Sequence, residues 1–273
     1  MGTAVDFASA LPPHGARVGA IGCGTSLFVA QAYAALRESL GLGETDAFPA
    51  SEAPTGRPYD RVLVISRSGT TTEVARYLGS IHGPRSLALV GVTGTPVAEA
   101  ADDVVPLPFA DERSVVQTRF ATSVLALLRA HLGQDLEPVI AQGELAVEAE
   151  LPVEPSRYTH YVSLGRGWTV GLANEAALKM REAAQAWAES YPAMEYRHGP
   201  ISVAGPQSVV WALGDVDPSV LEDAAGTGAT VVGGRLDAMA ELILIQRTAV
   251  ALAESRGLDP DRPRHLTRSV VLS

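Results

Sequence analysis

Residues 17–26 read Arg-Val-Gly-Ala-Ile-Gly-Cys-Gly-Thr-Ser, and residues 27–40 continue as an Ala- and Leu-rich stretch without proline. A short apolar run, a glycine turn and a helix-forming stretch predict a buried strand, a tight turn and a helix. The same order returns later in the chain. Residues 158–164 are strand-like, Gly-Arg-Gly follows at 165–167, and an Ala-, Glu- and Lys-rich stretch occupies 170–190. The repetition predicts two units of the same kind.

Further strand-like segments alternate with helix-like stretches. The strand-like segments are residues 61–66, 86–93, 104–107, 208–213 and 230–233, and the helix-like ones are 72–82, 116–132 and 236–255. Strands that alternate with helices are typical of a parallel sheet covered on both faces. We therefore expect an α/β protein of two units, each a mostly parallel sheet with helices on both faces.

An acidic segment with two prolines, residues 142–156, separates the two repeats. It predicts a domain boundary, with a first domain over residues 1–150 and a second, smaller one over 151–273. The length of 273 residues agrees with about two modest domains.

The composition narrows the class of protein. Hydrophobic residues make up 47% and charged residues 19%, as in folded proteins. The net charge of -10 would repel a polyanion, so we expect no nucleic-acid partner, although a small anion needs only a local pocket of donors. No apolar run approaches the roughly 18 residues that span a bilayer. We expect a cytoplasmic protein without a membrane partner.

The metal-ligating residues are few and scattered. The only cysteine, Cys23, cannot form an intramolecular disulfide, and the six histidines show no ligand spacing. The sequence therefore predicts neither a metal site nor a cofactor.

Two turns rich in hydroxyl groups follow strand-like segments. The residues of interest are Thr25 and Ser26 in the first turn, and Ser66, Arg67, Ser68 and Thr71 in the second. Glycine lets a ligand approach the backbone, hydroxyls and amides donate, and a helix N-terminus favours an anion. One such turn is explained by an ordinary helix cap. Two of them at the carboxyl edge of one parallel sheet, where α/β folds bind ligands, predict a phosphate site.

A dinucleotide site is the alternative for the first turn, because Gly22-Cys23-Gly24 follows a strand-like segment. The third glycine of that fingerprint is replaced by Leu27, which disfavours this alternative.

Three charged residues share one face of the helix expected over 170–190. At about 100° per residue, Glu175, Lys179 and Glu182 fall within about 60° of one another. Leu178 and Trp187 are predicted to point into packing instead. The ordinary interpretation of the charged face is a solvated Glu-Lys pair worth a few tenths of a kcal/mol. The helix alone does not decide between this and a catalytic carboxylate.

A polar loop, Glu-Tyr-Arg-His-Gly-Pro over 195–200, carries His198. A histidine on a loop is a proton-transfer candidate, although a surface or capping role is more common.

Taken together, these motifs resemble the sugar isomerase (SIS) family, and within it the isomerase half of the glucosamine-6-phosphate synthases, which contains two SIS units. The resemblance rests on five places in the same order: residues 22–26, 66–71, 175–182, 195–200 and 259–270.

The resemblance implies a sugar 6-phosphate bound by Ser26, Ser66, Ser68 and Thr71, with the backbone of Val115 near the sugar. It implies that Glu182 moves a proton between C1 and C2, with Glu175 and Lys179 as neighbours. A carboxylate beside an ammonium suits that chemistry. His198 would open the sugar ring. In the family this histidine comes from the adjacent subunit, so a homodimer with shared active sites is implied.

The departures from the family affect the expected reaction. The glutamine-hydrolysing domain is expected to be absent, because position 2 is Gly2 and only about 20 residues precede the first motif. Arg268 replaces the lysine that forms a Schiff base, and a guanidinium stays protonated. We expect Arg268 to bind phosphate or polarise an oxygen. Arg67 replaces a glutamine and adds positive charge beside the expected phosphate.

Several functions therefore stay open. An isomerase or deaminase acting on an amino-sugar 6-phosphate is the first. A dehydratase that eliminates the 3-hydroxyl of N-acetylglucosamine 6-phosphate or a similar sugar is the second. A non-catalytic phosphosugar sensor is the third, although the acidic composition disfavours a DNA-binding regulator.

Overall fold

The computed structural model describes residues 10–272, and these divide into two compact units. One unit comprises residues 10–113, 117–134 and 267–272, and the other comprises 114–116 and 135–266. Compared with the expected division at residues 150 and 151, residues 135–150 lie in the second unit and the C-terminal segment lies in the first.

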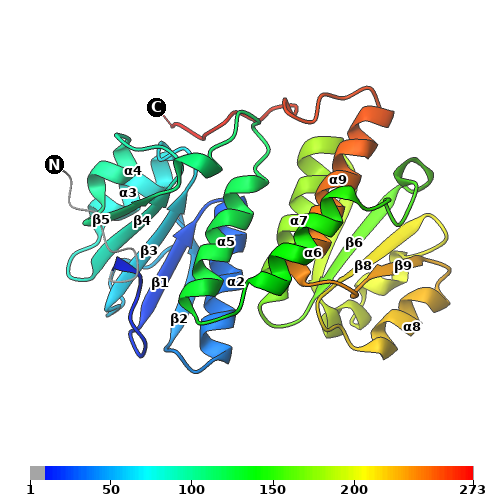
Figure 1. The fold of residues 1–273 in the computed structure, drawn as a ribbon, viewed down its shortest axis with the longest axis horizontal. Helices are drawn as coiled ribbons and strands as arrows, with labels where there is room; N and C mark the ends of the chain where they lie inside the picture. The colour runs from blue at the N-terminus through cyan, green and yellow to red at the C-terminus, as the bar shows by residue number, and fades with distance from the viewer. Residues whose placement is uncertain (1–9, 273) are drawn as a thin grey trace. The chain divides into compact units, whose positions relative to one another are not determined.

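The first unit is built on a parallel sheet with the strand order β2-β1-β3-β4-β5. Its helices α2 and α5 lie on one face of the sheet and α3 and α4 on the other (Figure 1). The strands are β1 (Val18–Gly22), β2 (Thr45–Pro49), β3 (Arg61–Ser66), β4 (Arg85–Val90) and β5 (Asp103–Pro106). The helices are α2 (Thr25–Ser39), α3 (Thr72–Ser80), α4 (Pro96–Ala100), η1 (Pro108–Ala110) and α5 (Arg119–His131).

The second unit has a parallel sheet with the order β7-β6-β8-β9. Helices α6, α7 and α9 cover one face and α8 the other (Figure 1). The strands are β6 (His160–Gly165), β7 (Trp187–Pro192), β8 (Ser208–Leu213) and β9 (Thr230–Gly233). The helices are α6 (Glu137–Glu148), η2 (Pro155–Arg157), α7 (Thr169–Ala184), η3 (Ala193–Arg197), η4 (Pro200–Val203), α8 (Pro218–Gly226) and α9 (Ala238–Ser255).

The two sheets repeat one topology. The order β2-β1-β3-β4 of the first unit recurs as β7-β6-β8-β9 in the second. Every residue of the central strands β1 and β8 is buried, as strands covered by helices on both faces require. The predicted α/β fold, with a parallel sheet and flanking helices in each of two units, is confirmed.

The helix expected over residues 170–190 is shorter than predicted. It ends at Ala184, where Gln185 adopts a left-handed conformation with φ 51°, and the edge strand β7 begins at Trp187. The prediction that Trp187 packs inside is wrong, because this residue is 70% exposed on the edge strand. Leu178 is only partly buried.

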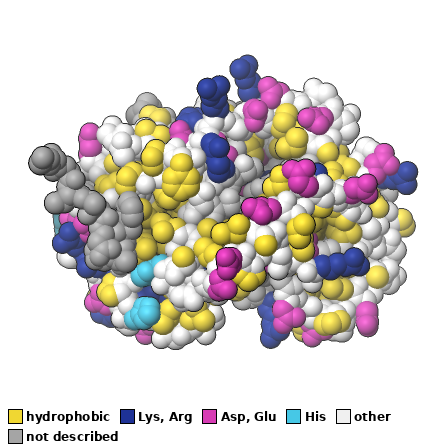
Figure 2. Space-filling view, viewed as in Figure 1, with side chains coloured by type: hydrophobic (Ala, Val, Ile, Leu, Met, Phe, Trp, Pro, Cys, Tyr) yellow, Lys and Arg dark blue, Asp and Glu magenta, His cyan; other side chains and the backbone are white. Residues whose placement is uncertain are grey.

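The surface carries charges of both signs. Figure 2 shows acidic, basic and hydrophobic side chains interspersed across the face in view, without one continuous basic surface. Among the helices within residues 10–272, none combines the length and the hydropathy that crossing a bilayer demands.

Candidate active site

The first hydroxyl turn sits at the carboxyl end of the central strand β1. A Cβ on Gly22 would lie 2.5 Å from the backbone carbon of Ser26, so only glycine lets the chain turn directly into α2. Gly24, at φ 54°, is the N-cap residue of α2. The buried residues Thr25 and Ser26 therefore form the first turn of this helix.

The second hydroxyl turn, Ser66–Thr72, carries most of the residues predicted to bind phosphate, and for that prediction it is called the phosphate loop below. It follows β3, which pairs with β1 in the register Ile21↔Val64, so both turns lie at the same edge of the sheet. Gly69 has φ 65°, and a Cβ there would lie 2.0 Å from Thr95 Oγ1. Thr71 is the N-cap residue of α3. The structure thus brings the two predicted turns together within the first unit.

Hydroxyl groups of the phosphate loop differ in their partners. Ser68 Oγ accepts hydrogen bonds from Thr70 N at 3.2 Å and from Thr70 Oγ1 at 3.1 Å. Ser66 Oγ is buried and has no hydrogen-bond partner within residues 10–272. A buried polar group without a partner costs free energy, which is explained if a ligand satisfies it.

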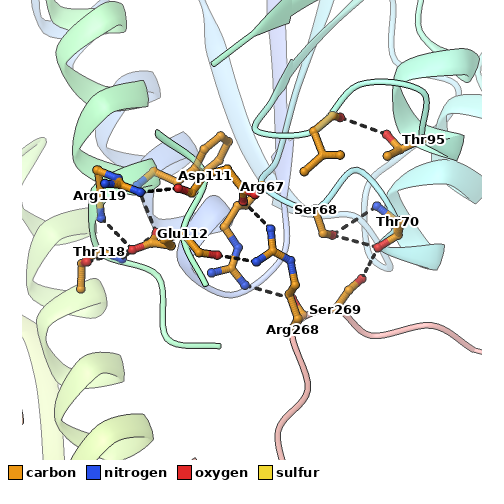
Figure 3. Close-up of polar contacts among 12 residues, drawn as sticks. Arg67, Ser68, Thr70, Thr95, Asp111, Glu112, Thr118, Arg119, Arg268 and Ser269 are labelled. Carbon is orange, nitrogen blue, oxygen red and sulfur yellow. Dashed lines mark hydrogen bonds and ion pairs between the residues drawn. The ribbon is translucent and has the colours of Figure 1, made fainter. Parts of the chain in front are cut away.

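Arg67 and Arg268 meet beside this loop (Figure 3). Arg67 is buried, and its Nη2 donates to the carbonyl oxygen of Arg268 at 3.1 Å. The guanidinium of Arg268 donates to the Asp111 carboxylate and to the carbonyl oxygen of Glu112. Arg268 therefore contacts an acidic partner of the first unit.

Asp111 and Glu112 are residues that the sequence reasoning missed. The Glu112 carboxylate accepts from the backbone amides of residues 118–120 at 3.0–3.2 Å and so caps α5. Arg119 also donates to the carbonyl oxygen of Asp111. Their position in the sequence could have indicated them, because they follow β5, whose carboxyl end lies at the same sheet edge as the two hydroxyl turns.

The charged face of α7 is buried, not solvated. Glu175 is 0% and Lys179 1% exposed, whereas 19% of the Glu182 side chain is exposed. Lys179 Nζ donates to Glu182 Oε2 and lies 3.4 Å from Glu175 Oε1. One lysine thus bridges two carboxylates, of which Glu182 is the accessible one.

The cost of burying these charges is offset by their pairing. Their neighbour Arg181 donates to the carbonyl oxygen of Ala188 at 2.7 Å. Burial lowers the pKa of Arg181, and the Glu182 and Glu175 carboxylates oppose this shift.

His198 lies on the surface of the second unit, after η3. Its backbone amide donates to the carbonyl oxygen of Glu195 at 3.0 Å. The preceding residue, Arg197, donates to Asp223 at 2.6 Å and to Ser219 at 2.8 Å, which ties η3 to α8. The imidazole is exposed to solvent.

Val115, predicted near the sugar, belongs to the second unit. Its backbone amide donates to the carbonyl oxygen of Asp261 at 3.2 Å.

The two repeated units share a glycine turn but differ in the loops and helices that follow it. Gly165 matches Gly22, because a Cβ on it would lie 2.4 Å from the backbone of Thr169. The loop after β8 contains Asp215 and Asp217 where the phosphate loop has serines and an arginine. Among the described residues, only the first unit therefore has a hydroxyl-rich loop at this position, and only α7 carries the buried ionic set.

One cavity of about 690 Å³ lies beside β9 in the second unit and contains none of the predicted site residues. Within residues 10–272, no cluster of His, Cys, Asp and Glu has the makings of a metal site.

The fold defines the chain as an α/β protein with two repeated units, each a parallel sheet flanked by helices. No protein-family model matches it. The isomerizing glutamine–fructose-6-phosphate aminotransferase of Sulfolobus acidocaldarius is 27% identical over 94% of this chain and 50% of its own length. The enzyme of the same name from Methanothermobacter thermautotrophicus is 29% identical over 94% of this chain and 52% of its own length. The chain spans about half the length of these relatives, and the predicted resemblance is confirmed.

Solved structures agree on the fold. A glucosamine-6-phosphate deaminase from Thermotoga maritima has a TM-score of 0.85 and 24% identity, covering 98% of this chain and 94% of that one. The C-terminal domain of a glucosamine-fructose-6-phosphate aminotransferase from Francisella tularensis has a TM-score of 0.74 and 21% identity, covering 91% and 87%.

Proposed function

We propose that this chain is a sugar-phosphate isomerase or deaminase that removes the C2 proton of an amino-sugar 6-phosphate. The observation that carries the proposal is the ionic set on α7, where Lys179 bridges two carboxylates and Glu182 keeps an accessible side chain. A carboxylate held beside an ammonium is suited to accept a proton from carbon, and the ammonium stabilises the developing oxyanion. The names of the relatives and of the structural neighbours support an amino-sugar or ketose 6-phosphate as substrate.

The residues take separate roles in this proposal. The phosphate is bound by Thr25, Ser26, Ser66, Arg67, Ser68 and Thr71. His198 moves the proton that opens the ring, which suits an imidazole near neutral pH. Glu175 is fully buried, so its role is to hold Lys179 in place. We propose that the protein works in the cytoplasm as a homodimer with shared active sites.

The reaction follows from these roles. Glu182 takes the C2 proton of the open aldehyde, the C–H electron pair forms a C1–C2 double bond, and O1 takes up the charge. Return of the proton to C1, together with transfer of the O2 proton to O1, gives the ketose. If C2 carries an amino group, the same transfer leaves an imine at C2, which water hydrolyses to the keto sugar and ammonia.

Proton NMR in heavy water tests the proposal. The protein is incubated with glucosamine 6-phosphate and, separately, with its N-acetyl form. Solvent deuterium at C2 or C1 together with fructose 6-phosphate is the expected result. Loss of the 3-hydroxyl from the N-acetyl substrate would instead identify a dehydratase, and binding without any exchange would identify a sensor.

The variant Glu182→Gln identifies the base. It should bind sugar phosphate within a few-fold of the wild type and lose deuterium exchange by at least about a hundredfold, because an amide cannot accept the proton. Unchanged exchange in this variant would remove Glu182 from that role.

A further inference from the structure

A short C-terminal strap, residues 267–272, runs along the phosphate loop within the first unit. Thr70 Oγ1 donates to Ser269 Oγ at 2.9 Å, and Thr72 N donates to the carbonyl oxygen of Val270 at 3.2 Å. The amide of Leu272 donates to Thr72 Oγ1 at 2.9 Å. The strap therefore follows the loop into the first turn of α3, and its side chains come from about 200 residues further along the chain.

The protons of the hydroxyl cluster show which groups remain as donors. A hydroxyl has one proton to donate and two lone pairs. Thr70 Oγ1 lies 3.1 Å from Ser68 Oγ and 2.9 Å from Ser269 Oγ, and its single proton serves one of these two contacts at a time (Figure 3). Ser68 Oγ already accepts from Thr70 N, so when Thr70 donates to Ser269, Ser68 can donate to Thr70 and the Ser269 proton is left without an acceptor among residues 10–272. In this arrangement the strap supplies one hydroxyl donor beside the phosphate loop.

The neighbouring residue, Arg268, fixes the strap in place. Its carbonyl oxygen accepts from the buried Arg67, and its guanidinium pairs with the Asp111 carboxylate and the Glu112 carbonyl oxygen. Charge-assisted bonds of this kind hold a defined geometry. Arg268 therefore links the strap to two different loops at the carboxyl edge of the sheet.

We infer that Ser269 is a further phosphate-binding residue, delivered by the strap, and that Arg268 is the positioning residue that holds the strap on the phosphate loop. The inference rests on the proposed function, since it takes the phosphate of the sugar as the ligand. In this inference Arg268 acts through its ion pair with Asp111 and does not contact the reacting carbons of the sugar.

The first experiment measures the binding of glucosamine 6-phosphate to the full chain by calorimetry. Ser269→Ala should raise the Kd at least about tenfold, as loss of a hydrogen bond to a charged group does. Ser68→Ala is the positive control. Ser255→Ala is the matched control, because Ser255 lies near the C-terminus and only bonds the carbonyl oxygen of Leu252.

The second experiment separates positioning from folding. Arg268→Gln and Asp111→Asn should each raise KM about five- to tenfold, and the double variant should be no worse than either one, since both remove the same ion pair. Arg268→Lys should recover part of the loss because it keeps the charge. Arg262→Gln, which changes an exposed arginine five residues before the strap, should leave KM unchanged. A purely structural role of Arg268 would lower the melting temperature without moving KM.

The outcomes distinguish this inference from the proposed function. If the wild type binds the sugar phosphate and Ser68→Ala weakens binding, but Ser269→Ala and Arg268→Gln change nothing, the strap has no role and the proposed function stands. If the wild type binds no sugar phosphate, both are overturned.

Discussion

At the scale of single residues, the candidate site contains polar groups that are unusual for a protein interior. Some of them are buried charges, and one is a buried hydroxyl without a hydrogen bond to any described residue. Lys179 is an ammonium inside the protein, and it is tolerated because carboxylates flank it on α7. Ser66 is the opposite case, a buried hydroxyl to which residues 10–272 offer no hydrogen bond. Such groups are costly in a fold that serves packing alone, which is why they mark the candidate site.

Ser66→Ala should separate binding from stability. Because Ser66 Oγ makes no hydrogen bond with a described residue, its removal should leave the melting temperature unchanged or slightly higher. The KM for the sugar phosphate should rise about tenfold if the hydroxyl donates to the phosphate. Ser80→Ala is the control, because Ser80 bonds the carbonyl oxygen of Tyr77 at 2.7 Å and lies at the far end of α3. A lowered melting temperature with unchanged KM in Ser66→Ala would contradict the assignment.

At the scale of elements, the sequence predicts what periodicity and composition encode. The buried strands β1, β3, β4, β6 and β8 are mostly apolar, so they were predictable. The edge strands β2 and β7 were not, since Thr-Asp-Ala-Phe-Pro and Trp-Ala-Glu-Ser-Tyr-Pro mix polar and apolar residues without a period. The end of α7 was missed because Gln185, not glycine, takes the left-handed position.

The same limit applies to the candidate site: local sequence patterns identify some of its residues and miss others. Candidate residues that lie within motifs, such as Ser68 and Glu182, can be identified from the residues next to them in the sequence. Asp111 and Ser269 contact residues distant in sequence, and a single sequence does not reveal such contacts. Burial of Glu175 and Lys179 was equally hidden, because it depends on what packs over α7.

The buried carboxylate of Glu241 on α9 stabilises both the turn before this helix and the strand β8. Glu241 is buried; its Oε1 accepts from the amides of Arg235 and Leu236, and its Oε2 accepts from Trp211 Nε1 at 2.9 Å. Glu241→Ala would leave these donors unsatisfied and should lower the free energy of unfolding by about 2–4 kcal/mol. Asp237→Ala, which removes the helix cap on Met239, should cost about 1 kcal/mol. Urea denaturation measures both, and equal losses would contradict this account of Glu241.

At the scale of the whole molecule, one topology serves two different tasks. The repeat places a glycine turn and a helix after β1 and again after β6, yet only the first unit carries the hydroxyl-rich loop and only the second carries the buried ionic helix. Each unit alone therefore lacks half of the groups that the proposed reaction needs. We expect activity to require both units of the folded chain.

The pH dependence of stability should include a contribution from His131. Burial lowers its pKa below the ordinary value of 6.5, and the hydrogen bond to the Pro12 carbonyl oxygen only partly opposes this. The unfolded chain then binds more protons than the folded chain below pH 6.5, so the contribution is present above that pH and is lost as the pH falls from 6.5 toward the lowered pKa. His131→Gln should show a smaller fall in melting temperature between pH 7 and pH 5.5. An identical fall in both proteins would show that another group is responsible.

Mixing two inactive variants tests whether active sites are shared between subunits. His198→Ala lacks the ring-opening group, and Glu182→Gln lacks the base, so each should be inactive alone. If His198 acts on substrate bound to the adjacent subunit, a mixed dimer contains one site with both residues intact and one with neither. Random mixing makes half of the dimers mixed, so about a quarter of the wild-type activity should return. Native mass spectrometry of differently tagged chains provides the control that mixed dimers form. Mixed dimers without recovered activity would place both residues in the site of one subunit.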